Sequence, residues 1–140
     1  MFTFNKINHV LNLHHDNPLF WSEIGLDVCI ESCKNIEDDD WNRFHKNWYQ
    51  ANPEWQLRFA NLLGFSDSNK ALPLLLEFIC KAPDRVGFEI IDSLKEFPLE
   101  QVLQLITEKE LNTIYRLYSS STGLEKMAME YFLSQLQPNK

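Results

Sequence analysis

The sequence predicts an all-α protein, a short right-handed stack of antiparallel helical hairpins (an α-solenoid). Apolar residues recur at spacings of three and four, as amphipathic helices require. Short segments with proline or glycine separate these runs, and the pattern repeats every 31 residues. With 140 residues, 44% of them hydrophobic and 24% charged, the chain has the size and composition of one globular domain, residues 1–140. We expect about seven or eight helices.

The repeat is clearest when residues 55–64 are compared with residues 86–95. The apolar pairs at this shift are Trp55 and Val86, Phe59 and Ile90, Ala60 and Ile91, and Leu63 and Leu94. The same shift aligns Trp41, Phe44 and Trp48 with Leu72, Leu75 and Ile79, and Leu72, Leu74 and Leu75 with Leu103, Leu105 and Ile106. One helical hairpin cannot bury its apolar face alone, so successive hairpins are expected to stack.

The expected helices follow from these runs and from the breaks between them. In the repeats of residues 40–106 they cover about 41–50, 54–63, 69–80, 84–96 and 99–106. Thr107 and Glu110 form a capping-box pattern for a helix over 108–119, and a last helix over 124–136 completes a C-terminal cap of residues 107–140. Residues 1–36 do not follow the period and are expected to form an atypical N-terminal cap, with helices near 3–14 and 19–34.

The segment WQLRFANLLG (55–64), followed by a turn and ALPLLLEFI (71–79), resembles the HEAT-type repeat. The resemblance covers about residues 40–106. It implies a scaffold for binding and no particular chemistry.

The net charge of −7 lies entirely in one segment of the chain. Residues 16–40 hold one base, Lys34, and eight acids: Asp16, Glu23, Asp27, Glu31, Glu37, Asp38, Asp39 and Asp40. The rest of the chain has twelve acids and twelve bases. This balance argues against direct DNA or RNA binding, which needs a basic face.

Four acids in a row at 37–40 precede the helix expected from Trp41. Asp39 or Asp40 would cap that helix, and a solvated acidic surface is the simpler interpretation. Four carboxylates exceed what capping requires, and Glu23, Asp27 and Glu31 are spaced so that like charges repel along one helical stripe. We therefore favour a surface for a basic partner, and expect that neutralising residues 38–40 weakens partner binding but hardly changes the melting temperature.

The aromatic residues divide into two groups. Those at repeat positions are expected in the core: Trp41, Phe44, Trp48, Trp55 and Phe59. Trp21 and Tyr49 fall outside that pattern, and Tyr49 is expected to be exposed. Because Trp and Tyr often dominate interface energetics, we predict these two as anchors beside the acids.

Catalytic motifs are not found: the sequence has no glycine-rich phosphate loop, HExxH, GxSxG or paired CxxC. Cys29 and Cys33 could share a zinc site only with two further ligands, such as His14 and His15, and small buried side chains are the favoured interpretation. We expect no enzyme activity, no catalytic residue, no metal and no cofactor. The start MFTFNKINHV lacks a secretory pattern, and with three cysteines this favours the cytoplasm and no membrane contact.

The pattern DDDWNRFHKNW followed by NPEWQLRFANLLG, within residues 38–64, resembles the small helical immunity proteins of bacterial polymorphic toxin systems, including contact-dependent growth inhibition. The resemblance implies one cognate toxin, bound 1:1 in the cytoplasm and blocked at or near its active site. The expected toxin is a basic nuclease, with an RNase favoured, because an acidic surface would bind its cationic active site. The predicted partner-binding residues are Trp21, Glu23, Asp27, Glu31, Glu37, Asp38, Asp39, Asp40 and Tyr49. A HEAT-like adaptor unrelated to toxins is the alternative, and an enzyme comes third.

Overall fold

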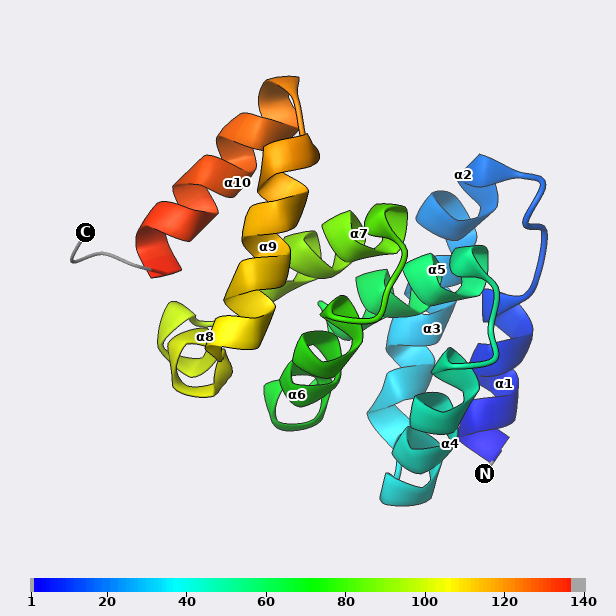
Figure 1. The fold of residues 1–140 in the computed structure, drawn as a ribbon. Coiled ribbons are helices and arrows are strands. Elements are labelled where there is room, and N and C mark those ends of the chain that lie inside the picture. Colours follow the sequence, from blue (N-terminus) through cyan, green and yellow to red (C-terminus); the bar gives the residue numbers. More distant parts are fainter. Residues whose placement is uncertain (1, 137–140) are drawn as a thin grey trace.

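The structure is a computed structural model that describes residues 2–136, and within that range it contains helices and no strand (Figure 1). The predicted all-α class is confirmed. The elements are α1 (Phe2–Leu11), α2 (Pro18–Phe20), the π-helical turn η1 (Trp21–Gly25), α3 (Leu26–Ser32), the 3-10 turn η2 (Cys33–Asn35), α4 (Asp38–Trp48), α5 (Pro53–Leu63), α6 (Ser68–Ile79), α7 (Asp84–Leu94), α8 (Leu99–Leu105), α9 (Glu108–Ser120) and α10 (Gly123–Leu136). Residues 18–35 run without a break from α2 to η2 and are called the 18–35 helix below.

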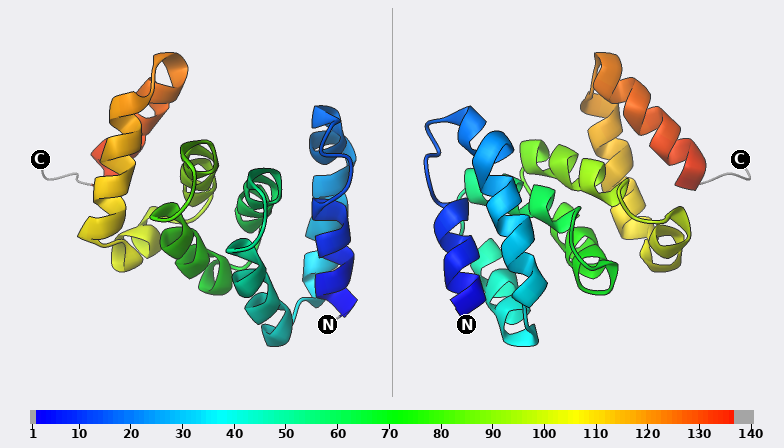
Figure 2. Two further views of the ribbon diagram at one scale, coloured as in Figure 1. Left: turned by 45° about the vertical axis from the view of Figure 1, so that its right-hand side comes forward. Right: turned by 180° about the vertical axis from the view of Figure 1, so that it is seen from behind.

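The two hairpins α4–α5 and α6–α7 correspond to the 31-residue repeat. In Figure 2, α5 and α7 lie in one layer, and α4 and α6 lie in the other. Of the repeat's matched apolar side chains in these four helices, Leu74 is half-buried and the others are buried: Trp41, Phe44, Trp48, Trp55, Phe59, Ala60, Leu63, Leu72, Leu75, Ile79, Val86, Ile90, Ile91 and Leu94. The hairpins are also joined through polar groups, because Ser93 Oγ in α7 donates to the Ala60 carbonyl in α5 at 2.7 Å.

Aromatic stacking fills the space between the first three repeat helices. Phe44 of α4 stacks on Phe59 of α5 with ring centroids 4.9 Å apart. Trp48 stacks on Phe78 of α6 at 4.1 Å, with the two rings nearly parallel. Such pairs add about 0.5–1.5 kcal/mol beyond the burial of their area. The prediction that the tryptophans of this region belong to the core is confirmed.

The repeat does not extend to α8 in the way the sequence predicts. Leu103 and Leu105, aligned with the buried Leu72 and the half-buried Leu74 of α6, are exposed. Val102 is the buried residue of this short helix. The chain leaves α8 after Leu105 and begins α9 at the predicted capping box, where the Thr107 N–H donates to Glu110 Oε1 at 2.7 Å. Both leucines lie within α8 but on its exposed side, so the 31-residue register does not predict which side of α8 is buried.

Arg58, in α5, is buried among the N-terminal helices. Its guanidinium donates to the carbonyls of Leu13 at 2.6 Å and His14 at 3.2 Å, with longer contacts to Val10 and Leu11. These carbonyls lie in and just beyond the last turn of α1. Those of Val10 and His14 also accept backbone N–H groups, and that of Leu11 also contacts His15 Nε2 at 2.8 Å. His14 itself adopts a left-handed backbone conformation, with φ of 51°. Arg58 therefore caps the end of α1 from another helix, and burial lowers its pKa from the usual value.

The 18–35 helix packs against α1 and α5 along one side. Its buried residues are Trp21, Gly25, Cys29 and Ser32, spaced by three and four. A Cβ at Gly25 would lie only 2.8 Å from Trp21 Cε3 and 3.1 Å from Phe20 Cε2, so a larger residue does not fit without movement. The Trp21 indole donates to Asn61 Oδ1 of α5 at 2.9 Å. Seen from behind, this helix lies on the outside of the stack, with its other side facing solvent (Figure 2, right).

We predict that Arg58→Met lowers the free energy of unfolding by about 2–4 kcal/mol, because it removes the charged hydrogen bonds to the Leu13 and His14 carbonyls, the first of them at 2.6 Å. Arg58→Lys should recover part of the loss, since an ammonium cannot span the same carbonyls as the planar guanidinium fork. Urea denaturation at pH 7, followed by tryptophan fluorescence, measures both changes.

The matched control is Arg85→Met, which removes an exposed arginine that pairs with Glu54 at 2.6 Å. It should cost no more than about 1 kcal/mol. Equal effects at positions 58 and 85 would contradict a structural role for the buried guanidinium.

Candidate protein-docking surface

Asp40 is a structural residue. It is buried, and its carboxylate accepts hydrogen bonds from the backbone N–H of Phe4 at 3.0 Å and of Glu37 at 2.9 Å. It thereby caps the first turn of α1 and closes the capping box at the start of α4, where Glu37 holds the N-cap position. The predictions that Asp39 or Asp40 is the N-cap and that Asp40 is a surface residue are therefore wrong. Burial acts to raise the pKa of Asp40, but the hydrogen bonds that the carboxylate accepts, those from Glu37 and Phe4 among them, outweigh it and the pKa is lowered.

Asp38 and Asp39 are exposed but already face cations of the same chain. Asp38 Oδ1 lies 3.0 Å from Lys70 Nζ of α6, and Asp39 Oδ2 lies 3.5 Å from Arg43 Nε one turn along α4. Exposed pairs contribute little stability, about 0–1 kcal/mol, but they reduce the local excess of negative charge. Most of the acidic run is thus explained by the fold, and Glu37 remains as its exposed N-terminal carboxylate.

The two predicted aromatic anchors do not lie beside the acidic run. Trp21 is buried and hydrogen-bonded, so it is not available to a partner in this structure. Tyr49 is 46% exposed, as predicted, but it follows the C-terminal end of α4, an 11-residue helix whose start carries the acids. The rise of an α-helix separates the two ends by about 15 Å.

Tyr49 instead belongs to a small polar cluster between α4 and α6. Its hydroxyl donates to the carboxylate of Glu77, whose Oε2 also lies 2.7 Å from His45 Nε2. Burial and the bond to the negative Glu77 raise the pKa of Tyr49 to about 12. Lys81 Nζ lies 5.2 Å from the centre of the Tyr49 ring. The tyrosine therefore joins α4 to α6, and the cluster holds charges of both signs.

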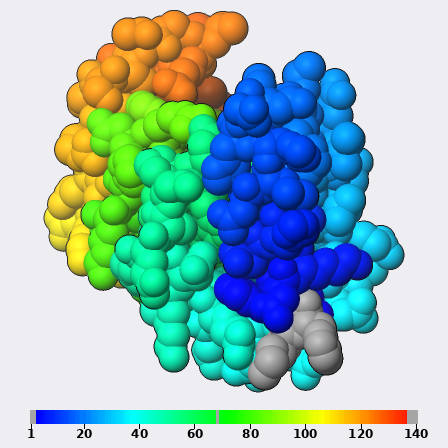
Figure 3. Space-filling view, turned by 90° about the vertical axis from the view of Figure 1, so that its right-hand side faces the viewer, coloured from blue at the N-terminus to red at the C-terminus, as the bar shows by residue number. Residues whose placement is uncertain are grey.

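The outward side of the 18–35 helix carries the exposed acids that the fold does not use. We call it the outer face: Leu19, Glu23, Ile24, Asp27, Val28 and Glu31. The apolar side chains are 59% exposed at Leu19, 56% at Ile24 and 38% at Val28. Residues 18–32 contain no basic side chain, and the nearest one along the chain, Lys34, pairs with Glu31 at 2.9 Å. In Figure 3 this helix and α1 form the surface of the N-terminal end.

The outer face differs from the sequence prediction in its apolar members. Glu23, Asp27 and Glu31 were predicted, and all three are exposed. Leu19, Ile24 and Val28 were missed, because an exposed apolar residue looks like a core residue in a sequence. Their spacing of five and then four differs from the register of the buried Trp21, Gly25 and Cys29, and this mismatch is the signal that could have identified them.

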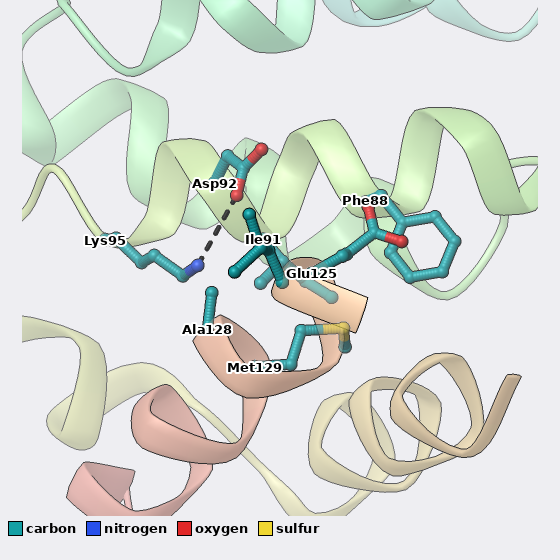
Figure 4. A pocket seen from close by; sticks show the side chains of 8 residues that line it. Phe88, Ile91, Asp92, Lys95, Glu125, Ala128 and Met129 are labelled. Atoms are coloured by element: carbon teal, nitrogen blue, oxygen red, sulfur yellow. Dashed lines mark hydrogen bonds and ion pairs between the residues drawn. The ribbon is translucent and has the colours of Figure 1, made fainter. Parts of the chain in front are cut away.

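A separate hollow of about 220 Å³ lies between α7 and α10 (Figure 4). Its floor includes Ile91 and Met129, and Phe88 closes one side. Asp92 and Lys95 pair across its edge at 3.4 Å. The lining combines apolar side chains with two acids, Asp92 and Glu125, and one base, Lys95, so it offers space for a peptide side chain beside charges of both signs.

The described residues offer no metal centre: among them, no group of three or more His, Cys, Asp or Glu side chains is placed to hold an ion. Cys29 and Cys33 are free thiols, and burial raises their pKa to about 12 and about 11, so both stay protonated at neutral pH. Within residues 2–136, none of the helices has the length and apolar character that crossing a bilayer would require.

Comparison of the chain with protein-family models, with curated proteins and with solved structures finds no match. The function is therefore argued from the geometry of the chain itself.

We predict that Asp40→Asn lowers the free energy of unfolding at pH 7 by about 1–3 kcal/mol, because charged acceptors make the stronger hydrogen bonds. The sequence-based expectation that this position can be neutralised with little change in melting temperature then fails. The folded-state pKa of Asp40 lies below 3.8, so the carboxylate stabilises the fold above about pH 4 and this contribution is lost as the pH falls through the folded pKa.

Chemical denaturation at pH 7, 5 and 3 measures this dependence. The difference between wild type and the variant should shrink at pH 3. Asp39→Asn, an exposed neighbour, is the control and should stay within about 0.5 kcal/mol of wild type at every pH. A pH-independent difference for Asp40→Asn would show that the charge of the carboxylate is not what matters.

Proposed function

We propose that this protein binds a basic protein through its outer face and neutralises it. The observation that carries the proposal is the combination found there: three exposed apolar side chains beside three exposed carboxylates, of which Glu31 pairs with Lys34. A protein interface needs an apolar centre to release water and charged groups to select the partner. The outer face supplies both, and its negative sign selects a cationic partner.

The energetics favour recognition over a purely structural role for this face. Leu19, Ile24 and Val28 gain little from burial within the chain, because each keeps more than a third of its surface in water. Covering their apolar surface would yield about 25 cal/mol for each Å² removed from water. The carboxylates would steer a cationic partner to the face, with an association rate that falls as salt is added.

A cytoplasm-acting toxin domain, most simply a basic nuclease, is the partner class we propose. A nuclease site is cationic because it holds phosphates, so an acidic protein can cover it and compete with the nucleic acid. The resemblance of residues 38–64 to immunity proteins of polymorphic toxin systems supports the same partner, bound 1:1. RNase is the favoured nuclease class because it fits an inhibitor that acts in the cytoplasm.

A HEAT-like adaptor is the second candidate, and the hollow between α7 and α10 favours it. That hollow lies far along the chain from the outer face, and its lining carries a base, Lys95, beside the two acids Asp92 and Glu125. An adaptor would bind its peptide there and would keep its affinity when the outer face is changed.

The test is a triple variant, Glu23→Gln, Ile24→Ser and Asp27→Asn, co-expressed with the product of the gene directly upstream, which is where a toxin gene is expected. Wild type should restore growth to cells that make this product and should bind it in calorimetry. The triple variant should bind at least about 100-fold more weakly, because it removes two charges and one apolar anchor from the same face.

The matched control is Glu96→Gln, Glu100→Gln and Leu105→Ser, which removes the same number of charges and one exposed leucine near α8. It should bind and rescue like wild type, and both variants should melt near the wild-type temperature. Rescue by the outer-face variant would refute the proposed surface. Absence of any toxin activity in the upstream product, with no binding, would refute the toxin assignment.

A further inference from the structure

We propose that a second hollow, between the end of the 18–35 helix, the start of α4 and the α5–α6 turn, receives an arginine side chain of the basic partner. We call it the Trp41 pocket. It is bounded by Ile30, Ile36, Trp41 and Phe65, with Lys34 and Asp67 at its rim, and its volume is about 240 Å³. Pockets for whole metabolites are larger, about 300–1,000 Å³, so this one suits a single long side chain.

The walls of the Trp41 pocket match the stem of an arginine. Ile30 and Ile36 are half-buried, so each keeps apolar surface open to the pocket. Phe65 is 52% exposed and stands in the turn between α5 and α6. Arginine stems pack on apolar surface while the charged end stays polar, and a guanidinium near an aromatic ring gains about 0.5–1 kcal/mol at an exposed site.

The charges around the pocket favour a cation. Asp67 lies in the lining and holds the N-cap position of α6, where its Oδ1 accepts from the Asn69 N–H at 3.1 Å. The exposed acids Glu31 and Glu37 directly follow the lining residues Ile30 and Ile36 in the chain. The base at the rim, Lys34, is paired with Glu31 at 2.9 Å.

An arginine fits these surroundings better than an aromatic or aliphatic anchor. A purely apolar side chain would fill the walls but leave the carboxylate of Asp67 at the rim without a counter-charge from the partner. A lysine would satisfy the charge, but its ammonium does not stack on a ring as a planar guanidinium does. Arginine is also over-represented among residues that dominate interface energetics.

The Trp41 pocket continues the surface of the outer face, because Ile30 and Lys34 belong to the same helix as Asp27 and Glu31. This inference therefore deepens the proposed function: it rests on a basic partner and adds the side chain that the partner inserts. The two can fail separately, since the outer-face variant changes Glu23, Ile24 and Asp27, none of which lines the pocket.

The experiment is an NMR titration of the ¹⁵N-labelled full chain with N-acetyl-arginine N-methylamide. Its citrulline counterpart has nearly the same shape without the charge, and its norleucine counterpart keeps only an apolar stem. We expect the arginine probe to bind in the millimolar range and to shift the Trp41 indole and the amides of Ile36, Phe65 and Asp67. The other two probes should leave these signals in place at the same concentration.

Two variants test the assigned contacts. Asp67→Asn removes the charge but keeps a good N-cap for α6, and Phe65→Leu keeps an apolar wall but removes the aromatic face. Each should weaken binding of the arginine probe by roughly two- to fivefold. Asp92→Asn makes the same change in net charge away from the pocket and should have no effect.

Equal binding of the arginine and citrulline probes would overturn the inference, because charge would then not be recognised. Shifts confined to other parts of the surface, or unchanged affinity in both pocket variants, would overturn it as well. If the pocket fails while the outer-face variant still loses its protein partner, the proposed function stands without the arginine. If the outer-face variant still binds the protein partner, the proposed function is refuted even where the Trp41 pocket binds the arginine probe.

Discussion

The buried guanidinium of Arg58 is the contact on which the N-terminal end of the molecule depends. It donates to the carbonyls of Leu13 and His14, just beyond the end of α1, and His14 holds a left-handed conformation. The rings of Phe20 and Trp21 lie within 6 Å of the same group, at 5.6 and 5.7 Å. One side chain of α5 thus fixes both α1 and the start of the 18–35 helix. The direction in which the outer face points follows from this contact.

The surplus negative charge of residues 16–40 serves two different purposes. Asp40 is inside the structure and joins the starts of α1 and α4, while Asp38 and Asp39 face cations of the same chain. Glu23 and Asp27 lie on the outer face, beside exposed apolar side chains. Most of the four consecutive acids therefore make contacts within the chain. The more widely spaced acids are the ones on which the proposed function rests.

Spacing predicted the helices and the core well, because burial in a stacked hairpin follows the period of the helix. Trp55, Phe59 and their partners 31 residues later are buried as expected. The same argument failed at Leu103 and Leu105, because α8 buries the side that carries Val102 and leaves these two leucines exposed. It also could not identify Arg58 or Asp40, since a buried charge is stabilised by groups distant in the sequence. The carbonyls that Arg58 binds come from residues 44 to 48 positions earlier.

The inner and outer sides of the 18–35 helix are under opposite constraints, and this difference argues for recognition. Gly25 cannot gain even a methyl group without displacing Trp21 or Phe20, so the inner side has almost no freedom to change. Exposed positions such as Ile24 and Asp27 contact little of the chain, and substitutions there alter stability by only about 0.5 kcal/mol. A helix held this firmly on one side can change the chemistry of its other side without losing the fold. Such a face suits a protein whose partner varies, because affinity can be adjusted independently of folding.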